Sequence, residues 1–124
     1  EKLKDNYRMQ IIFKSKKKYD PIGARLQKFY NSIIINCTSV GMNSNISPIK
    51  TKLLKKNQII IDTIYTPLKT KLVRDAESVG ARTIMGLDMF IYQALASIDL
   101  WFGEETTNKV NFEELKGYIE SYLC

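Results

Sequence analysis

The chain has 124 residues, with 19 lysines and arginines against 13 aspartates and glutamates, a formal net charge of +6 and no histidine. This length accommodates one domain with a real core, but not a cofactor domain together with a substrate domain. The absence of histidine excludes a serine or cysteine protease triad and argues against zinc, so we expect no metal site.

The two cysteines, Cys37 and Cys124, have neither metal-ligand spacing nor a disulfide framework around them, and we expect both to be reduced thiols. The sequence contains neither an apolar stretch of membrane-spanning length nor a signal-peptide core at its N-terminus. A cytoplasmic protein without membrane contact is therefore the expectation. Because the sequence opens on Glu1 rather than methionine, we also expect it to begin partway into a longer protein.

Four apolar segments predict the strands of a parallel sheet. Three of them are nearly continuous apolar runs, which are typical of strands covered on both faces. The four segments are residues 9–13, 32–36, 58–65 and 82–85.

Helical patterns lie between and after these strands. Ser47 followed by Pro48 predicts a helix start, Gly80 a left-handed C-cap, and Asn111 an N-cap with acidic residues in the following turn. Alternating strands and helices predict an α/β fold with a doubly wound parallel sheet. The predicted helices span residues 21–30, 48–56, 71–79, 87–102 and 112–123.

Open α/β sheets bind ligands at the carboxyl ends of their strands, so the residues directly after each strand are the functional candidates. The second predicted strand leads into Asn36-Cys37-Thr38-Ser39-Val40-Gly41-Met42, where small residues let the backbone approach a ligand closely. The alternative is an ordinary strand-to-helix turn.

The third predicted strand leads into Asp62-Thr63-Ile64-Tyr65-Thr66-Pro67-Leu68-Lys69-Thr70. Here the Tyr65 hydroxyl is free to meet a polar ligand, while Pro67 stiffens the exit. The alternative is a structural tyrosine. We interpret Asp62, at a buried strand end, as a structural hydrogen-bond acceptor rather than a base.

The fourth predicted strand leads into Gly86-Leu87-Asp88-Met89, and Gln93 follows on the first turns of the long helix. Gln93 offers two donors and one acceptor, which suits a polyhydroxylated ring. We interpret the apolar stripe of the same helix as core.

Taken in this order, the segments resemble the C-terminal half of shikimate dehydrogenase over residues 32–103. The family has a similar Asn-Ala-Thr-Ser-x-Gly-Met turn, and this chain has Cys37 in place of the alanine. The family also has an Asp-x-x-Tyr-x-Pro-x-x-Thr segment and a Leu-Trp-x-Gly ending, which here ends at Gly103. The resemblance implies a Rossmann-like doubly wound sheet that lacks its first strand and glycine-rich turn. Residues 1–124 would then be the C-terminal part of a dinucleotide-binding domain, including its two terminal helices.

The resemblance also implies a reaction, the NADP-dependent interconversion of shikimate and 3-dehydroshikimate in aromatic amino-acid biosynthesis. The family's proton-transferring lysine and aspartate belong to an N-terminal substrate domain, a predicted partner that this chain lacks. We therefore expect no catalytic residue here and no activity of this piece alone. The implied substrate-binding residues are Tyr65 and Gln93, and the implied cofactor-binding residues are Thr38, Ser39, Gly41, Thr63, Gly86 and Met89.

Cofactor choice depends on Lys14, Ser15 and Lys16, which follow the first predicted strand. An acidic residue there would favour the ribose hydroxyl of NAD, and residues 14–19 contain none. Lysine charges favour a 2′-phosphate, so NADP is the prediction, although the family's usual Asn-Arg-Thr is not matched.

Two other functions remain open at this point. A non-catalytic nucleotide-binding or interaction module of the same fold is favoured by the missing glycine loop and disfavoured by the retained Tyr65 and Gln93. A nucleic-acid binder is suggested by the net charge and by aromatic residues near the lysine run, but those aromatics fit helix and strand faces. We therefore predict no nucleic-acid partner.

Overall fold

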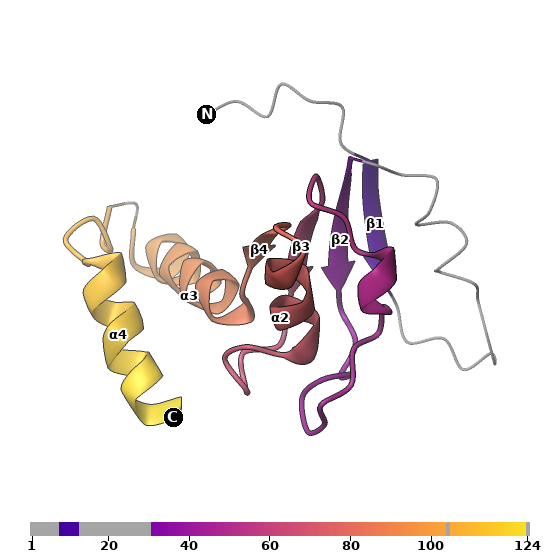
Figure 1. Cartoon of the computed structure of the whole chain (residues 1–124). Coiled ribbons are helices and arrows are strands. Elements are labelled where there is room, and N and C mark those ends of the chain that lie inside the picture. Colours follow the sequence, from indigo (N-terminus) through magenta and orange to yellow (C-terminus); the bar gives the residue numbers. More distant parts are fainter. Residues whose placement is uncertain (1–7, 13–30, 104, 124) are drawn as a thin grey trace.

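Four parallel strands form the centre of the molecule. The computed structural model describes residues 8–12, 31–103 and 105–123. The strands are hydrogen-bonded in the order β1-β2-β3-β4, with Ile34 of β2 paired to Ile60 of β3 and Asn36 to Asp62 (Figure 1). Their bounds are β1 Arg8–Ile12, β2 Ser32–Asn36, β3 Ile59–Asp62 and β4 Arg82–Ile84.

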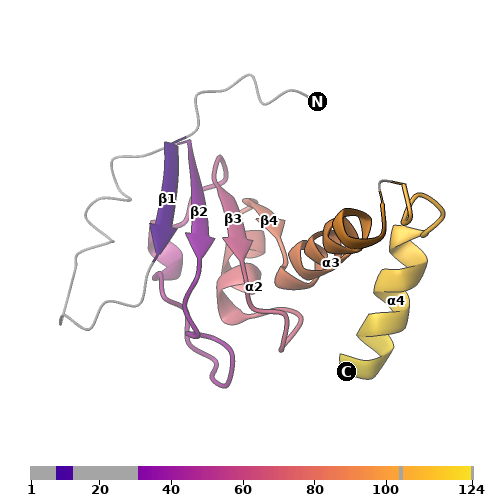
Figure 2. The ribbon, with the colours of Figure 1, turned by 180° about the vertical axis from the view of Figure 1, so that it is seen from behind.

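The helices take two different positions relative to this sheet. The 3₁₀ turn η1 (Thr51–Leu53) and helix α2 (Lys71–Ser78) lie on one face, while α3 (Gly86–Phe102) leaves β4 at the sheet edge and contacts α4 (Phe112–Leu123). Figure 2 shows the opposite face, where no described helix covers the strands. The helix predicted over residues 21–30 lies outside the described residues. The predicted α/β class with a parallel sheet is confirmed.

The core lies between the sheet and α2. Ile34 and Ile60 are fully buried there together with Leu72, and Ile49 and Leu54 reach in from either side of η1. Each such side chain stabilises the fold by roughly 1.5–3 kcal/mol relative to an exposed position. Along β2, half-buried residues alternate with buried ones, so the described elements cover one face of the sheet more fully than the other.

Side chains and glycine fix both ends of α2. The Thr70 hydroxyl accepts a hydrogen bond from the Val73 amide at 3.3 Å and caps the N-terminus. At the other end Gly80 has φ +76°, its amide donates to the Glu77 carbonyl at 2.9 Å, and the Ala81 amide donates to the Ala76 carbonyl at 3.0 Å. This paired arrangement is a Schellman motif, which confirms the predicted cap at Gly80.

The helix predicted over residues 48–56 is wrong. The segment contains a single 3₁₀ turn, because Lys50 and Leu54 on either side of it have extended backbone. The Ser47 hydroxyl accepts from the Ile49 amide at 3.3 Å but also donates to the Ile49 carbonyl at 2.7 Å, which closes a local turn instead of starting a helix. The extended flanks let both Ile49 and Leu54 enter the core.

The predicted bounds of β2 and α4 are confirmed, and those of the other described elements differ by one to three residues. β3 ends at Asp62 rather than Tyr65, because the Ile64 amide donates to the Asp62 carboxyl at 3.2 Å instead of to the neighbouring strand. β1 begins one residue earlier than predicted, and Phe13 lies outside the described residues. Met85, predicted as strand, is the N-cap of α3.

Helix α4 begins where Asn111 predicts it. The Asn111 side-chain oxygen accepts from the amides of Glu113 and Glu114 at 3.1 and 3.2 Å. One ion pair, Lys116 Nζ to Asp88 Oδ1 at 2.6 Å, connects α4 to α3, and the hydrogen bond that Lys116 donates to Asp88 raises the pKa of Lys116. No residue of α4 is buried, so the helix is held by few contacts within the described part of the chain.

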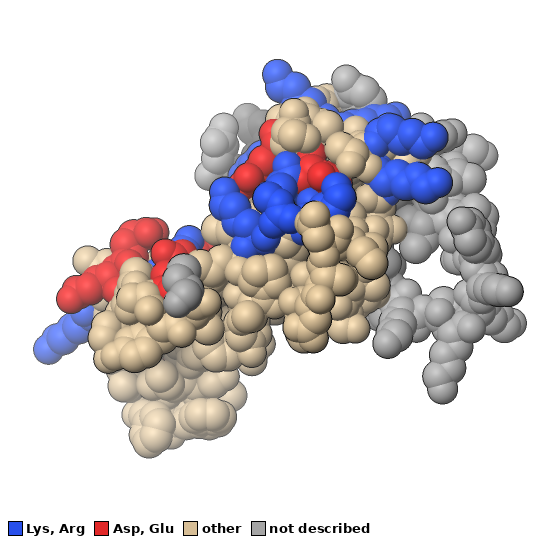
Figure 3. Space-filling view, turned by 60° about the horizontal axis from the view of Figure 1, so that its bottom comes forward, with Lys and Arg blue, Asp and Glu red and all other residues tan. Residues whose placement is uncertain are grey.

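Figure 3 shows charged side chains of both signs in the middle of this face and a second, mainly acidic group at its left end. Cys37 is an exposed, unpaired thiol, as expected, while Cys124 lies outside the described residues. Within the described ranges, no helix has both the length and the apolar character needed to cross a membrane.

We expect Asp75 to make the stability of the fold pH-dependent. Asp75 accepts from Lys71 Nζ at 2.7 and 2.8 Å and from Thr51 Oγ1 at 2.8 Å, which joins η1 to α2. Burial alone would raise the pKa of Asp75, but these bonds and the charge of Lys71 hold the pKa below its ordinary value of 3.8. A lowered folded-state pKa gives stability that is present above the unfolded pKa and is lost as the pH falls through the folded one.

Asp75→Asn should therefore lower the free energy of unfolding by about 0.5–1 kcal/mol at about pH 7. The further decrease of this free energy from about pH 5 to about pH 3 should be smaller in the variant than in the wild type. Urea unfolding at these pH values measures both effects. The control is Glu77→Gln, whose partner Lys69 is half exposed. An Asp75→Asn variant that keeps the wild-type pH dependence would contradict the assignment.

Candidate functional site

The turn that follows β2 is fixed by its own side chains. Asn36 is fully buried, and its side-chain oxygen accepts from the Thr38 amide at 3.1 Å and the Thr38 hydroxyl at 2.7 Å. The Thr38 hydroxyl in turn accepts from the Val40 amide at 3.1 Å. Gly41 follows with φ +106°, a conformation that side chains other than hydrogen rarely allow. The turn therefore has one defined shape at the sheet's carboxyl edge.

Asp62, at the end of β3, connects this turn to two other segments. Its carboxyl is fully buried and accepts from Asn36 Nδ2 at 3.0 Å, from the Ile64 amide at 3.2 Å and from the Thr70 hydroxyl at 2.6 Å. One side chain thus joins the turn after β2, the exit of β3 and the start of α2. The interpretation of Asp62 as a structural hydrogen-bond acceptor is confirmed.

Thr63 adds a second link between the same strand ends. Its amide and its hydroxyl both donate to the Asn36 carbonyl, at 3.1 and 2.9 Å. The hydroxyls and the amides of Thr38 and Thr63 are therefore engaged within the protein.

Gly86 brings the start of α3 against the exit of β3. A Cβ built at this position would lie 2.7 Å from the Thr63 carbonyl carbon and 2.6 Å from that of Ile64, and closer still to the Ile64 oxygen. Only glycine permits this approach without a backbone shift. Close packing therefore explains why position 86 is a glycine, independently of the role that the resemblance implies.

Tyr65, Met89 and Gln93 lie on the accessible side of this junction. The Tyr65 ring is 41% exposed and lies 5.3 Å from the ring of Phe90. Met89 is 38% exposed, and Gln93 is also exposed. Within the described part of the chain, neither the Tyr65 hydroxyl nor the Gln93 amide has a hydrogen-bond partner. Both groups are available to a ligand.

The structure says less about the other predicted site residues. Ser39 is exposed in the turn, where its carbonyl accepts from the Met42 amide at 3.2 Å. Lys14, Ser15 and Lys16 lie outside the described residues. No group of three or more histidine, cysteine, aspartate or glutamate side chains that could hold a metal ion occurs within the described ranges.

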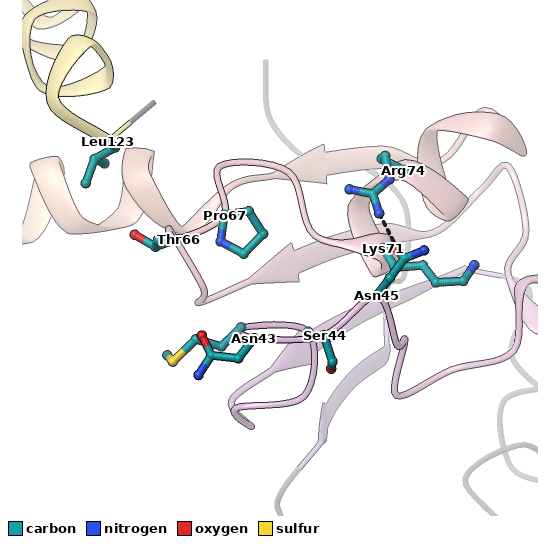
Figure 4. A pocket seen from close by; sticks show the side chains of 10 residues that line it. Asn43, Ser44, Asn45, Thr66, Pro67, Lys71, Arg74 and Leu123 are labelled. Carbon is teal, nitrogen blue, oxygen red and sulfur yellow. Dashed lines mark hydrogen bonds between the residues drawn. The ribbon is translucent and has the colours of Figure 1, made fainter.

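A pocket of about 590 Å³ lies beside the turn, and sequence reasoning did not predict it (Figure 4). Among its lining residues, Arg74 Nη2 donates to Asn45 Oδ1 at 2.6 Å, and Lys71 is paired with Asp75. The polar run Asn43-Ser44-Asn45 is the only sequence signal for it. Its lining is Gly41, Met42, Asn43, Ser44, Asn45, Thr66, Pro67, Lys71, Arg74 and Leu123.

Four parallel strands with a polar, hydrogen-bonded carboxyl edge define a Rossmann-like α/β protein. No family model matches the chain. A curated relative, the shikimate dehydrogenase (NADP(+)) of Pyrococcus abyssi, is 43% identical over 111 residues, and the match covers 82% of this chain and 42% of that protein.

Two solved structures agree with this match. A shikimate dehydrogenase in complex with NADP+ is 37% identical, with a TM-score of 0.62, over 74% of this chain and 32% of that one. Shikimate 5-dehydrogenase from Listeria monocytogenes, in complex with shikimate and NAD, is 27% identical, with a TM-score of 0.62, over 79% of this chain and 34% of that one. The chain belongs to the shikimate dehydrogenase family and corresponds to the C-terminal part of its members, less than half their length.

The Asp62 network predicts a large stability effect. Asp62→Ala leaves three buried donors without their acceptor, and we expect the free energy of unfolding to fall by about 2–5 kcal/mol. Thr70→Ser keeps a hydroxyl at one of the three positions and should cost less than about 1 kcal/mol. Urea unfolding of the whole chain measures both. Equal stability of Asp62→Ala and wild type would contradict a structural role.

Gly86 and Gly117 make a matched pair of helical glycines. Gly86→Ala forces a Cβ against the backbone of Thr63 and Ile64, and we expect a loss of about 2 kcal/mol or more. At Gly117, in α4, a Cβ meets nothing within 4 Å, so Gly117→Ala should stabilise the protein by about 0.5–1 kcal/mol. Thermal unfolding compares the two variants. A neutral Gly86→Ala would show that α3 does not pack on the β3 exit as described.

Proposed function

We propose that residues 1–124 are the C-terminal part of the dinucleotide-binding domain of an NADP-dependent shikimate dehydrogenase, which interconverts shikimate and 3-dehydroshikimate. The observation that carries the proposal is the junction at the carboxyl edge. The turn after β2, the exit of β3 and the start of α3 meet there through Asn36, Thr63 and Gly86. These are the three segments that match the family in order.

The residues at this junction fit the nicotinamide end of the cofactor. Positions 38–41, 63–65, 86 and 89 carry no charged side chain, and the half-exposed Tyr65 and Met89 suit a flat ring. When bound, NADP supplies or accepts the hydride of the reaction. The backbone from Thr38 to Gly41, together with Ser39, would line the cofactor groove, while Thr63, Gly86 and Met89 would border the ring.

Tyr65 and Gln93 would serve the substrate. Their free hydroxyl and amide suit the hydroxyls of a polyhydroxylated ring, and both lie beside the proposed nicotinamide position. They orient the substrate and do not transfer its proton. The Asp62 carboxyl is fully buried and already accepts from three donors, so we assign proton transfer to groups of the N-terminal part that the relatives have.

The test compares the chain alone with a chimera. In the chimera, this chain follows the part of the Pyrococcus abyssi relative that precedes the matched region. We expect shikimate-dependent reduction of NADP+ by the chimera and none by the chain alone. In the chimera, Gln93→Ala should cost about 1–3 kcal/mol in kcat/KM for shikimate, with little change for NADP+.

Ser97→Ala is the matched control, because the Ser97 hydroxyl bonds to the Gln93 carbonyl of its own helix at 2.8 Å. Tyr65→Phe should behave as Gln93→Ala does, since it removes only the hydroxyl. If Gln93→Ala lowers the melting temperature and leaves kcat/KM unchanged, the residue is structural. A chimera that folds and binds NADP+ without turnover would favour a non-catalytic binding module.

A further inference from the structure

The backbone around Tyr65 is well fixed, but its side chain has few contacts. The preceding residue, Ile64, is 3% exposed, and its amide donates to the Asp62 carboxyl at 3.2 Å. The Tyr65 ring is 41% exposed, and within the described residues its hydroxyl has no hydrogen-bond partner. An exposed side chain of this kind exchanges between staggered rotamers about its first bond. The backbone alone therefore does not fix the direction of the Tyr65 hydroxyl.

The Tyr65 ring has one described aromatic contact, with Phe90 of helix α3. Phe90 follows Gly86 by four residues, so both lie on the same side of the helix, one turn apart. Gly86 lies against the backbone of Thr63 and Ile64, and this contact directs that side of α3 toward the exit of β3. The Phe90 ring then lies 5.3 Å from the Tyr65 ring, with the planes inclined by 32°. Aromatic rings attract one another at this separation.

Phe90 is not a core residue. It is 42% exposed, whereas Leu87 and Ile91 of the same helix are 2% and 1% exposed. Its side chain has no polar atom, so it makes no hydrogen bond to a ligand. The other exposed aromatic residue of this part of the helix, Tyr92, stacks on Phe112 of α4 at 4.5 Å. The two exposed rings of α3 therefore have different partners, and the described partner of Phe90 is Tyr65.

We infer that Phe90 is a positioning residue for Tyr65, and that its ring holds the tyrosine in the orientation that presents the hydroxyl to the substrate. The inference rests on the proposed function for the identity of that substrate. Without the Phe90 ring, the Tyr65 side chain is distributed over several rotamers, and substrate binding has to restrict it to one. Loss of this ring should therefore weaken substrate binding and leave the chemical step unchanged.

Phe90→Leu removes the flat ring and keeps an apolar side chain. In the chimera described above, we expect KM for shikimate to rise about three-fold, because the hydroxyl is then shared among three staggered rotamers. The kcat and the KM for NADP+ should stay unchanged, as expected for a loss of binding alone. Phe90→Tyr keeps the ring and should restore the wild-type KM. Tyr92→Leu is the matched control, because its ring contacts Phe112 instead of Tyr65.

A double-mutant cycle distinguishes positioning from general packing. In a Tyr65→Phe background there is no hydroxyl to direct, so Phe90→Leu should no longer change KM for shikimate. An equal effect of Phe90→Leu in both backgrounds, together with a lower melting temperature, is the result of a packing role and would overturn the inference.

The orientation of Tyr65 is also measured without turnover, on the whole chain alone. NMR couplings between the Hα and Hβ protons of Tyr65, assigned with Tyr65→Phe, report its rotamer populations. We expect one dominant rotamer in the wild type and averaged couplings in Phe90→Leu. Averaged couplings in the wild type, or one rotamer that persists in Phe90→Leu, would contradict the inference. An ordered Tyr65 that Phe90→Leu releases, in a chimera without turnover, supports the ring contact and contradicts the proposed function, whereas turnover with an averaged Tyr65 does the reverse.

Discussion

The buried carboxyl of Asp62 is the constraint on which the carboxyl edge of this sheet depends. It accepts hydrogen bonds from three segments, namely the end of β2 where the turn begins, the exit of β3 and the cap of α2. Removing a buried group of this kind leaves its partners unsatisfied, which costs more than the bonds themselves contribute. Asn36 extends the same network to Thr38 and Val40, so the geometry of the turn follows from the position of one side chain.

Helix α3 is placed by the same junction. Gly86 lets its first turn contact the backbone of Thr63 and Ile64, which the Asp62 network has already fixed. Tyr65 and Phe90 then pack ring to ring across the contact. The residues proposed for substrate and cofactor therefore rest on a base fixed by packing and buried hydrogen bonds, which is the support that a binding site needs.

Sequence patterns predicted β2 and β3 well, because both contain a continuous isoleucine run, which is typical of strands in a parallel sheet. They also predicted the caps at Gly80 and Asn111, since cap chemistry is local. They were wrong over residues 48–56, where the tertiary demand that Ile49 and Leu54 both enter the core overrides a local helix signal. The end of β3 was also predicted too late in the chain. The Ile64 amide donates to the Asp62 side chain instead of to a neighbouring strand, and the apolar run does not indicate this bond. The position of the candidate segments after three strands could be predicted from the sequence, but the engagement of the Thr38 and Thr63 hydroxyls could not.

Native-state hydrogen exchange tests the central role of the Asp62 network most directly. The amides of Ile64, Thr38 and Val73 each donate to a side chain of the network, to Asp62, Asn36 and Thr70 respectively. If the network holds the carboxyl edge together, these amides exchange only through global unfolding, with the same opening free energy as core amides such as that of Ile60. If they instead exchange as fast as the amides of the exposed 43–45 loop, the edge opens locally and the account is wrong.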